Sequence, residues 1–235
     1  MVTMRHKKIV ALVTLIIISC FLNYTSHGQE QWIPFTSYTQ SRPIFSLHYS
    51  NNENVSFSVE TTGMVVLDVL AQEKTYQRLA IPDQNKSTGV GFPEIPVISQ
   101  LIAIPECEQV LLKIIPIDSV YMEDYNVYPV PQIVEKYYPD GYSYPAEEFA
   151  INDSVYSVDH YYPNSFGKIA ELASIREQQV ARVEIYPIQF NPVANNLKVY
   201  THIKVGLNFV SPKSAVVKDV GPFYKACRAT ILNYR

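Results

Sequence analysis

The chain has little glycine and little cysteine for its length, and it lacks a concentrated run of basic residues. Only 8 Gly and 3 Cys occur among its 235 residues, and the formal net charge at pH 7 is −3. A nucleic-acid-binding chain needs a concentrated basic face, so the composition excludes a nucleic-acid partner. No spacing of Cys and His resembles a zinc site, and no nucleophile precedes a glycine-rich elbow or begins a helix. The sequence therefore predicts no metal ion, no cofactor and no catalytic residue.

The residues that could carry chemistry are scattered along the chain. His202 falls on the outward side of an alternating segment, while His48 and His160 stand near a strand end and among tyrosines. Some acidic residues could be imagined as an acid pair or a cation site, but they lack fixed ligand spacing and indicate a solvated acidic face. These acids are Asp118, Glu123, Asp124, Glu147 and Glu148.

One long apolar run occurs, at the N-terminus. The sequence IVALVTLIIISCFL, residues 9–22, follows the basic residues Arg5, Lys7 and Lys8. The run is short for a bilayer span, and a basic flank ahead of it is typical of a secretory signal peptide. We therefore expect export through the inner membrane, no stable membrane span after cleavage, and a secreted or cell-surface protein.

The leader allows three kinds of processing. Ser26 and Gly28 supply small residues just before Gln29, which predicts cleavage between Gly28 and Gln29. The segment IISC, residues 17–20, also fits a lipoprotein box, in which Cys20 would be lipidated and become the new N-terminus. The third alternative is an anchor that is not cleaved.

Short strand-like segments follow one another through the rest of the chain. Its 18 Tyr and 16 Pro favour strands joined by proline-containing turns over helices. The series predicts an all-β fold, namely an antiparallel β-sandwich of Greek-key or jelly-roll type. Two of the segments are expected to pair as a hairpin around PECE, residues 105–108. The early segments are 43–50, 54–61, 64–71, 75–81, 97–105 and 109–118.

The clearest alternation lies between residues 180 and 209. Ala181, Val183 and Ile185 alternate with charged residues, and apolar residues again hold one parity after the turn NPVANN. A period of two over this length predicts two adjacent antiparallel strands with one buried face. The apolar positions after the turn are Leu197, Val199, Ile203, Val205, Leu207 and Phe209, whereas Lys198 and Lys204 face outward.

Residues 121–166 differ in composition from the segments before them, because they are rich in Tyr and Pro. Repeated prolines argue against regular sheet pairing in this segment. It is either an ordered excursion held by aromatic packing, where binding often occurs, or a meandering connection with edge strands. A regular pattern returns at Gly167, where residues 167–179 could form a helix or a strand. A strand is predicted, because Gly167 opens the segment and partner strands are already present.

The chain ends in a predicted short helix. After the polar connector of residues 211–222, Phe223, Cys227 and Ile231 recur at helical spacing. This apolar stripe needs a surface to cover it, either the sandwich or something outside these residues. Cys227 and Cys107 both follow the predicted cleavage site, and they either form a disulfide or remain unpaired small apolar residues.

Three segments combine residues in a specific order. They are GFPEIPVISQLIAIPE (91–106), VARVEIYPIQFNPVANNLKVYTHIKV (180–205) and PFYKACRATILNYR (222–235). The first resembles the Gly-x-Pro-x-(Leu/Ile)-Pro-Val segment of gingipain-type (C25) propeptides, and the second resembles that family's hairpin with Pro-(Val/Ile)-Gln-(Tyr/Phe)-Asn-Pro. The third is similar to the segment that leads from such a propeptide into the protease. Order and spacing agree as well, so the resemblance spans residues 30–235.

The resemblance implies a β-sandwich propeptide that helps a cysteine protease to fold and covers its active site until proteolysis removes it. The implied partner is the chain's own C25-type protease domain in cis, and the implied full-length precursor is a bacterial cysteine-type endopeptidase. The expected organisation is a signal peptide (1–28), a β-sandwich propeptide domain (29–212) and a connector with a short helix (213–235) that leads to an absent protease domain. The alternative is a secreted or lipid-anchored β-sandwich whose tyrosine-rich segment binds carbohydrate or a surface protein.

To inhibit the protease as a substrate-like ligand, the propeptide would need a side chain that fits the main specificity pocket of the active site. The resemblance implies that this side chain is basic, and the candidates are Arg176, Lys168 and Lys136. Arg176 and Lys168 rank above Lys136, because a regular strand next to them would fix their positions and lower the entropic cost of binding.

Overall fold

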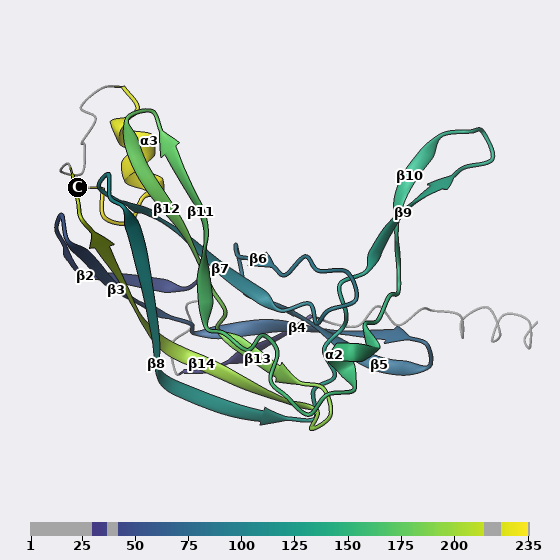
Figure 1. Cartoon of the computed structure of the whole chain (residues 1–235). Coiled ribbons are helices and arrows are strands. Elements are labelled where there is room, and N and C mark those ends of the chain that lie inside the picture. Colours follow the sequence, from purple (N-terminus) through teal and green to yellow (C-terminus); the bar gives the residue numbers. More distant parts are fainter. Residues whose placement is uncertain (1–29, 37–41, 214–221, 235) are drawn as a thin grey trace, which may run out of the picture.

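Two antiparallel sheets form the body of the molecule, and their inner faces share one hydrophobic core (Figure 1). The computed structural model describes residues 30–36, 42–213 and 222–234. In the first sheet, the long strand β14 (Asn196–Val210) pairs with β3 (Asn54–Glu60), β13 (Ile188–Asn191) and β8 (Gln109–Glu123), and β2 (Ile44–Ser50) lies beyond β3. The second sheet has the order β11 (Gly167–Ile175), β12 (Gln178–Ile185), β7 (Pro96–Ala103) and β6 (Asn85–Lys86).

Smaller elements extend this body. The strands β1 (Gln31–Pro34), β4 (Gly63–Ala71) and β5 (Lys74–Ala80) form a three-stranded sheet. The strands β9 (Gln132–Tyr137) and β10 (Ser143–Glu148) pair only with each other among the described residues, and two short helices follow, α2 (Asp153–Tyr156) and α3 (Tyr224–Thr230). The predicted fold class, an all-β antiparallel fold with a short C-terminal helix, is confirmed.

The core lies where the alternating segments predicted it. Phe57 of β3 and Val205 of β14 have no exposed surface, and neither do Ile98 of β7 and Val183 of β12 in the facing sheet. Tyr200 is buried although it lies on the parity that was predicted to face outward, because the Phe166 ring packs against it with centroids 5.2 Å apart. There the Tyr200 hydroxyl donates a hydrogen bond to Gln189 Oε1 at 2.7 Å, which satisfies a polar group that would otherwise be costly to bury.

Two predicted strand pairings are wrong, although the strands themselves exist. β7 and β8 do not form a hairpin around residues 105–108, because β7 pairs with β12 and β8 pairs with β14. The connection crosses between the sheets: the Ile104 N–H bonds to the Gln179 carbonyl, and the Glu108 N–H bonds to the Val210 carbonyl. Alternation shows which face of a strand is buried, but it does not show which strand lies beside it.

The second correction concerns residues 180–205, which form three strands in two sheets. The turn NPVANN joins β13 to β14 as expected, but β12 belongs to the opposite sheet. The chain passes from one sheet to the other at Tyr186 and Pro187. Because Pro187 has no N–H to donate to a ladder, it interrupts the strand where this crossing occurs.

Residues 121–166 contain more regular structure than their prolines suggested. β8 continues to Glu123, and residues 132–148 form the β9–β10 hairpin, in which Pro145 lies opposite Glu135. The expectation that this segment lacks sheet pairing is therefore wrong. A two-stranded ribbon leaves alternate N–H groups of each strand unpaired, so it tolerates a proline that an interior strand would exclude.

The C-terminal segment packs on the second sheet. Cys227 of α3, together with Ile231 and Tyr234, forms a small core with Ala103 and Val180 of β7 and β12. The Asn233 side chain accepts a hydrogen bond from the Ala103 N–H at 2.7 Å and donates one to the Ala103 carbonyl at 2.9 Å, as a neighbouring strand would. The helix prediction is confirmed, and the sandwich covers Cys227 and Ile231 of the predicted apolar stripe, whereas Phe223 is 48% exposed.

The sequence left open whether the two cysteines are bonded and how the leader is processed. Cys107 and Cys227 are both free thiols, so the unpaired alternative holds in this structure. The predicted cleavage site at Gly28 and Gln29, and the lipoprotein alternative at Cys20, lie outside the described residues. Within the described ranges, no helix combines the length and the apolar character needed to cross a membrane.

Candidate functional site

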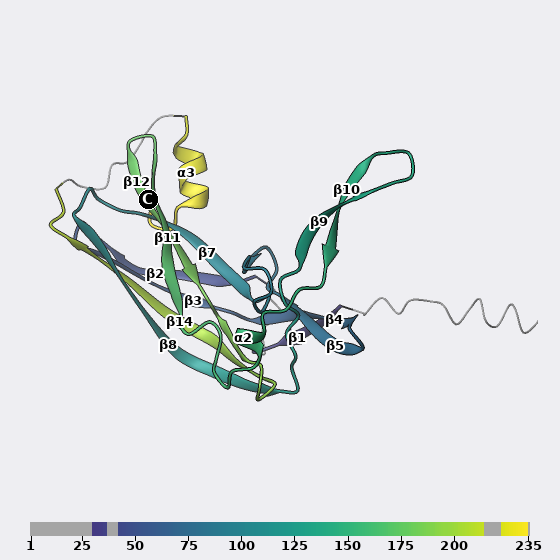
Figure 2. The same ribbon diagram turned by 45° about the vertical axis from the view of Figure 1, so that its right-hand side comes forward.

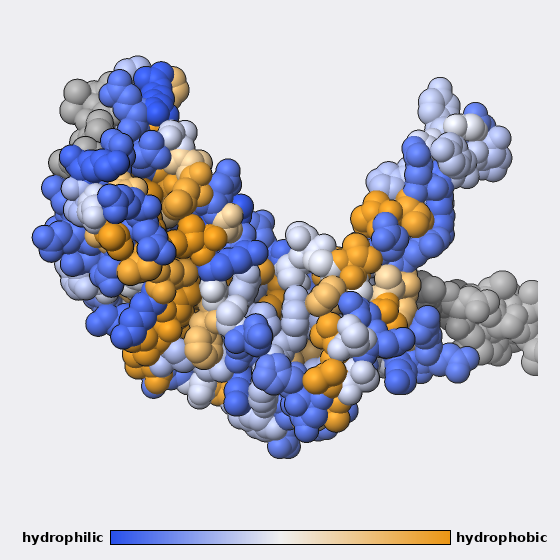
Figure 3. All heavy atoms as spheres, in the orientation of Figure 1, coloured by the Kyte–Doolittle hydropathy of each residue, from blue (hydrophilic) through white to orange (hydrophobic). Residues whose placement is uncertain are grey.

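A hollow separates two projecting parts of the molecule. The β9–β10 hairpin stands away from the body on one side, and the ends of β11 and β12 rise with α3 on the other (Figure 2). The space-filling view shows the hollow between them, with apolar residues exposed on both sides (Figure 3). A cavity of about 770 Å³ lies where β11 and β12 meet β6 and residues 87–89, and Lys168, Arg182, Glu184 and Tyr186 line it.

The β9–β10 hairpin exposes aromatic side chains. Tyr137 is 68% exposed and Tyr142 is 74% exposed, while the rings of Tyr138 and Tyr144 stack with their centroids 4.5 Å apart. Gly141, in the turn, has a φ of +91°, a backbone conformation that glycine adopts without strain. Exposed apolar surface on a projecting element indicates contact with another molecule.

Lys136 is the candidate inhibitory residue that the hairpin carries. It lies on β9 opposite Tyr144, and its Nζ is 3.3 Å from Glu148 Oε1 of β10. Both side chains of this ion pair are about half exposed, so water screens it and its contribution to stability is small, about 0–1 kcal/mol. A partner surface can therefore replace Glu148 as the neighbour of Lys136 at little cost.

Arg176 and Lys168 lie on the other side of the hollow. Arg176 is in the turn between β11 and β12 with a φ of +57°, and its Cζ is 3.9 Å from the centre of the Phe223 ring. Lys168 of β11 has its Nζ 3.5 Å from Glu184 Oε2, and the neighbouring Tyr186 and Glu184 raise the pKa of Lys168. Lys168 is therefore charged at neutral pH, but its charge is already paired. The structure does not bring the three candidates into one site.

The polar network at the base of the hairpin was missed from the sequence. Arg78 of β5 contacts Glu147 of β10 and Glu94, and Glu94 also contacts Lys86. These residues are spread over positions 78–147 without a common spacing, so no motif in the sequence predicted that they contact one another. Glu147 and Glu148 are both about half exposed, as expected of solvated acidic residues, but each carboxylate also has a basic partner.

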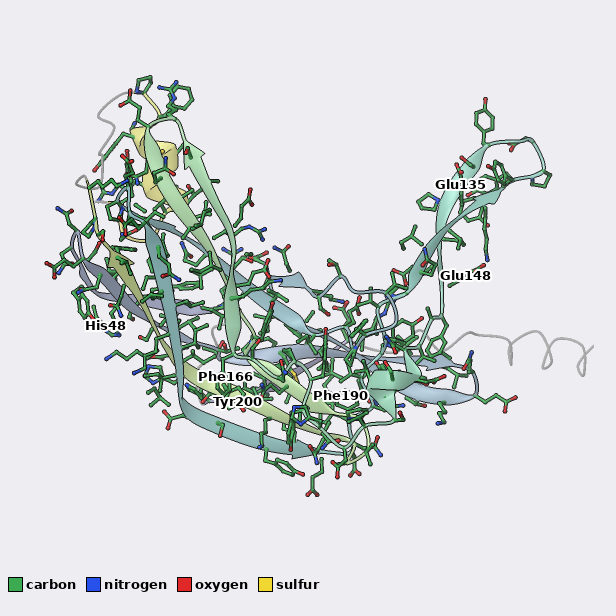
Figure 4. The ribbon with its side chains drawn as sticks, viewed as in Figure 1. His48, Glu135, Glu148, Phe166, Phe190 and Tyr200 are labelled. Carbon is green, nitrogen blue, oxygen red and sulfur yellow. The ribbon has the colours of Figure 1, made fainter. Side chains whose placement is uncertain are left out.

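The cysteines lie in apolar surroundings. Burial raises the pKa of the Cys107 thiol, which favours the neutral thiol over the nucleophilic thiolate. Cys227 belongs to the small core under α3. His202 contacts Asp118 of the neighbouring strand at 3.7 Å, and His48 of β2 lies on the opposite side of the molecule from the hairpin residues Glu135 and Glu148 (Figure 4). Among the described residues, no three side chains of metal-binding type gather in one place.

An antiparallel β body thus projects a hairpin with exposed tyrosines, a surface suited to contact with another protein. The chain belongs to the propeptide family of C25 peptidases, because the family model Propeptide_C25 matches residues 38–235. A search of curated proteins finds no match.

Two solved structures from Porphyromonas gingivalis share the fold. One is a complex of the RgpB pro- and mature domains, with a TM-score of 0.67 and 17% identity over 81% of this chain and 98% of that one. The other concerns the zymogenic latency of gingipain K, with a TM-score of 0.61 and 20% identity over 78% of this chain and 100% of that one. The matches extend over almost the whole of both of those chains, so this chain shares their fold.

Proposed function

We propose that this chain is the inhibitory and folding-assisting propeptide of a secreted C25-type cysteine endopeptidase, to which it binds in cis until proteolysis removes it. Family membership supports the proposal, and so does the description of one related structure as a complex of pro- and mature domains and of the other as concerning latency. The basic leader supports export, with cleavage between Gly28 and Gln29 favoured over lipidation at Cys20.

The observation that carries the proposal is a basic residue on a projecting hairpin. Lys136 is half exposed on β9, next to exposed tyrosines and away from the core. A protease active site is a cleft, and an element that stands off its own body can enter a cleft, whereas a residue on the face of a sheet cannot. We therefore place Lys136 ahead of Arg176, which lies against Phe223, and ahead of Lys168, which is paired with Glu184.

The test is inhibition in trans. Residues 29–235 are added to the cognate mature protease, and the inhibition constant is measured for the parent and for Lys136→Ala, with Lys74→Ala as a control at an exposed lysine of β5. Loss of a charged contact in the specificity pocket weakens binding by about 2–5 kcal/mol, which is more than tenfold. The control inhibits like the parent.

Two other results have different meanings. If Lys136→Ala inhibits fully while Arg176→Ala or Lys168→Ala does not, the block comes from the other side of the hollow. If the parent itself neither inhibits the protease nor raises the yield of its refolding, the proposed function is wrong.

A further inference from the structure

We infer that Arg78 is a positioning residue, which fixes the direction of the β9–β10 hairpin and, through it, the place of Lys136. The inference rests on the function proposed above, since it explains how the blocking side chain is presented. It also stands on geometry that can be measured in the free propeptide.

Backbone hydrogen bonds hold the two ends of the hairpin segment to one point of the body. The Gly91 N–H bonds to the Val130 carbonyl at 2.8 Å, and the Val130 N–H bonds to the Phe92 carbonyl at 2.8 Å. On the returning side, the Asn152 N–H bonds to the Gly91 carbonyl at 2.9 Å. These bonds fix where the segment leaves and rejoins the body, but they act outside residues 132–148 and leave the tilt of the hairpin undetermined.

Arg78 supplies the contact that sets the tilt. Its Nη2 donates to Glu147 Oε2 on β10 at 2.5 Å, and this is the one ion pair between the hairpin and the body within the described residues. The Arg78 side chain is only 21% exposed, and its strand β5 belongs to the three-stranded sheet rather than to the hairpin. The pair therefore joins the projecting hairpin to a strand of the three-stranded sheet.

The position of Arg78 is itself determined by its surroundings. Its Cζ lies 4.4 Å from the centre of the Tyr128 ring, and its Nε lies 3.6 Å from Glu94 Oε2, whose side chain is 11% exposed. The ring of Tyr128 also packs against Phe149, the residue directly after β10, at 5.6 Å between centroids. A planar guanidinium can stack on a ring and bridge two carboxylates at once, which an ammonium group cannot do as well.

Inhibition depends on how often the hairpin points in the competent direction. The apparent inhibition constant equals the intrinsic constant divided by the fraction of molecules in the binding-competent state. If loss of the Arg78–Glu147 pair lowers this fraction to about one tenth, the inhibition constant rises roughly tenfold without the loss of any contact to the protease.

The experiment compares Glu147→Gln, Arg78→Met, the double variant and the matched control Glu135→Gln, which removes an exposed carboxylate of the same hairpin. Inhibition of the cognate mature protease is measured beside thermal unfolding. Glu147→Gln and Arg78→Met should each weaken inhibition roughly tenfold, and the double variant should be no weaker than the worse single variant, because both remove the same pair. Arg78→Lys keeps the charge but not the fork and should restore inhibition in part.

A second readout follows the hairpin in the free propeptide. Spin labels at Tyr142→Cys, in the hairpin turn, and at Leu70→Cys, on β4, in a Cys107→Ser background, report the distribution of distances between hairpin and body. The parent and Glu135→Gln should give a narrow distribution of distances. Glu147→Gln should give a broad distribution, while its melting temperature equals that of the parent.

The inference is overturned if Glu147→Gln leaves the distribution narrow, or if the effects of the two single variants on inhibition add in the double variant. A parent that does not inhibit would refute the proposed function instead, and the distance distributions would still decide the role of Arg78.

Discussion

The sandwich body and the β9–β10 hairpin differ in how far their side chains are buried. In the body, residues such as Phe57, Ile98 and Ile203 have no exposed surface and pack against the facing sheet. In the hairpin, Tyr137 and Tyr142 are mostly exposed, and within the part of the chain that the structure describes each strand pairs only with the other. If the hairpin makes the inhibitory contact, as proposed, stability and inhibition reside in separate parts of the chain, and mutations should affect one without the other.

The largest expected effect on stability comes from the body. Phe57→Ala should lower the free energy of unfolding by about 3–5 kcal/mol, because it removes a fully buried ring and leaves a cavity between the sheets. Lys204→Ala, at an exposed position of β14, should change it by less than about 0.5 kcal/mol. Urea unfolding measures both values. A larger loss for the lysine variant would contradict the assignment of the buried face of β14.

A smaller loss in the free energy of unfolding is expected where the hairpin joins the body. Gly91 has a φ of +80°, and an added Cβ would lie 3.0 Å from the Asn152 backbone nitrogen. Gly91→Ala should therefore cost about 1–3 kcal/mol and also disturb the hairpin stem. Gly141 has a φ of +91° but no atom within 4 Å of an added Cβ, so Gly141→Ala should cost less, about 1 kcal/mol. Equal losses in thermal unfolding would mean that crowding at Gly91 has no role.

The smallest effect on stability, less than about 0.5 kcal/mol, is expected at the tip of the hairpin for Tyr142→Ser. The same change should weaken binding to the mature protease by more than about 1 kcal/mol if Tyr142 lies in the interface, since aromatic side chains dominate such contacts. Calorimetry of the free propeptide and titration into the protease separate the two quantities. A variant that melts early yet binds normally would reverse the division between body and hairpin.

The positions of the strands could be predicted from the sequence, but their neighbours could not. The parity of Val199, Ile203 and Val205 identified the buried face of β14, because side chains of a strand alternate between its faces. The partner of each strand depends on crossings such as Tyr186–Pro187, where the buried parity changes from Val183 and Ile185 to Ile188 and Phe190 as the chain changes sheets. This change of parity marks the crossing, but it does not identify the strand that lies beside each segment.

The candidate site was predictable only in part. The three basic residues could be selected by type, and Lys136 was among them, but its place on a projecting hairpin was hidden by the prolines around it. The network of Arg78, Glu94 and Glu147 was invisible, because these residues meet through folding and share no spacing. Residues that act by positioning another element are found from contacts, not from motifs.

The strand β8 has a consequence for the behaviour of several copies of the chain in a crowded compartment. It is 15 residues long, it pairs with β14 alone within the described residues, and it exposes Leu111 and Ile117. A long, apolar edge of this kind is a template for aggregation, since its free N–H and C=O groups can bind another chain. Pro116 removes one donor near the middle of the strand, and the register shift at His202 bends the ladder beside it. We expect the same irregularities that shape the sheet to limit the pairing of β8 with another chain.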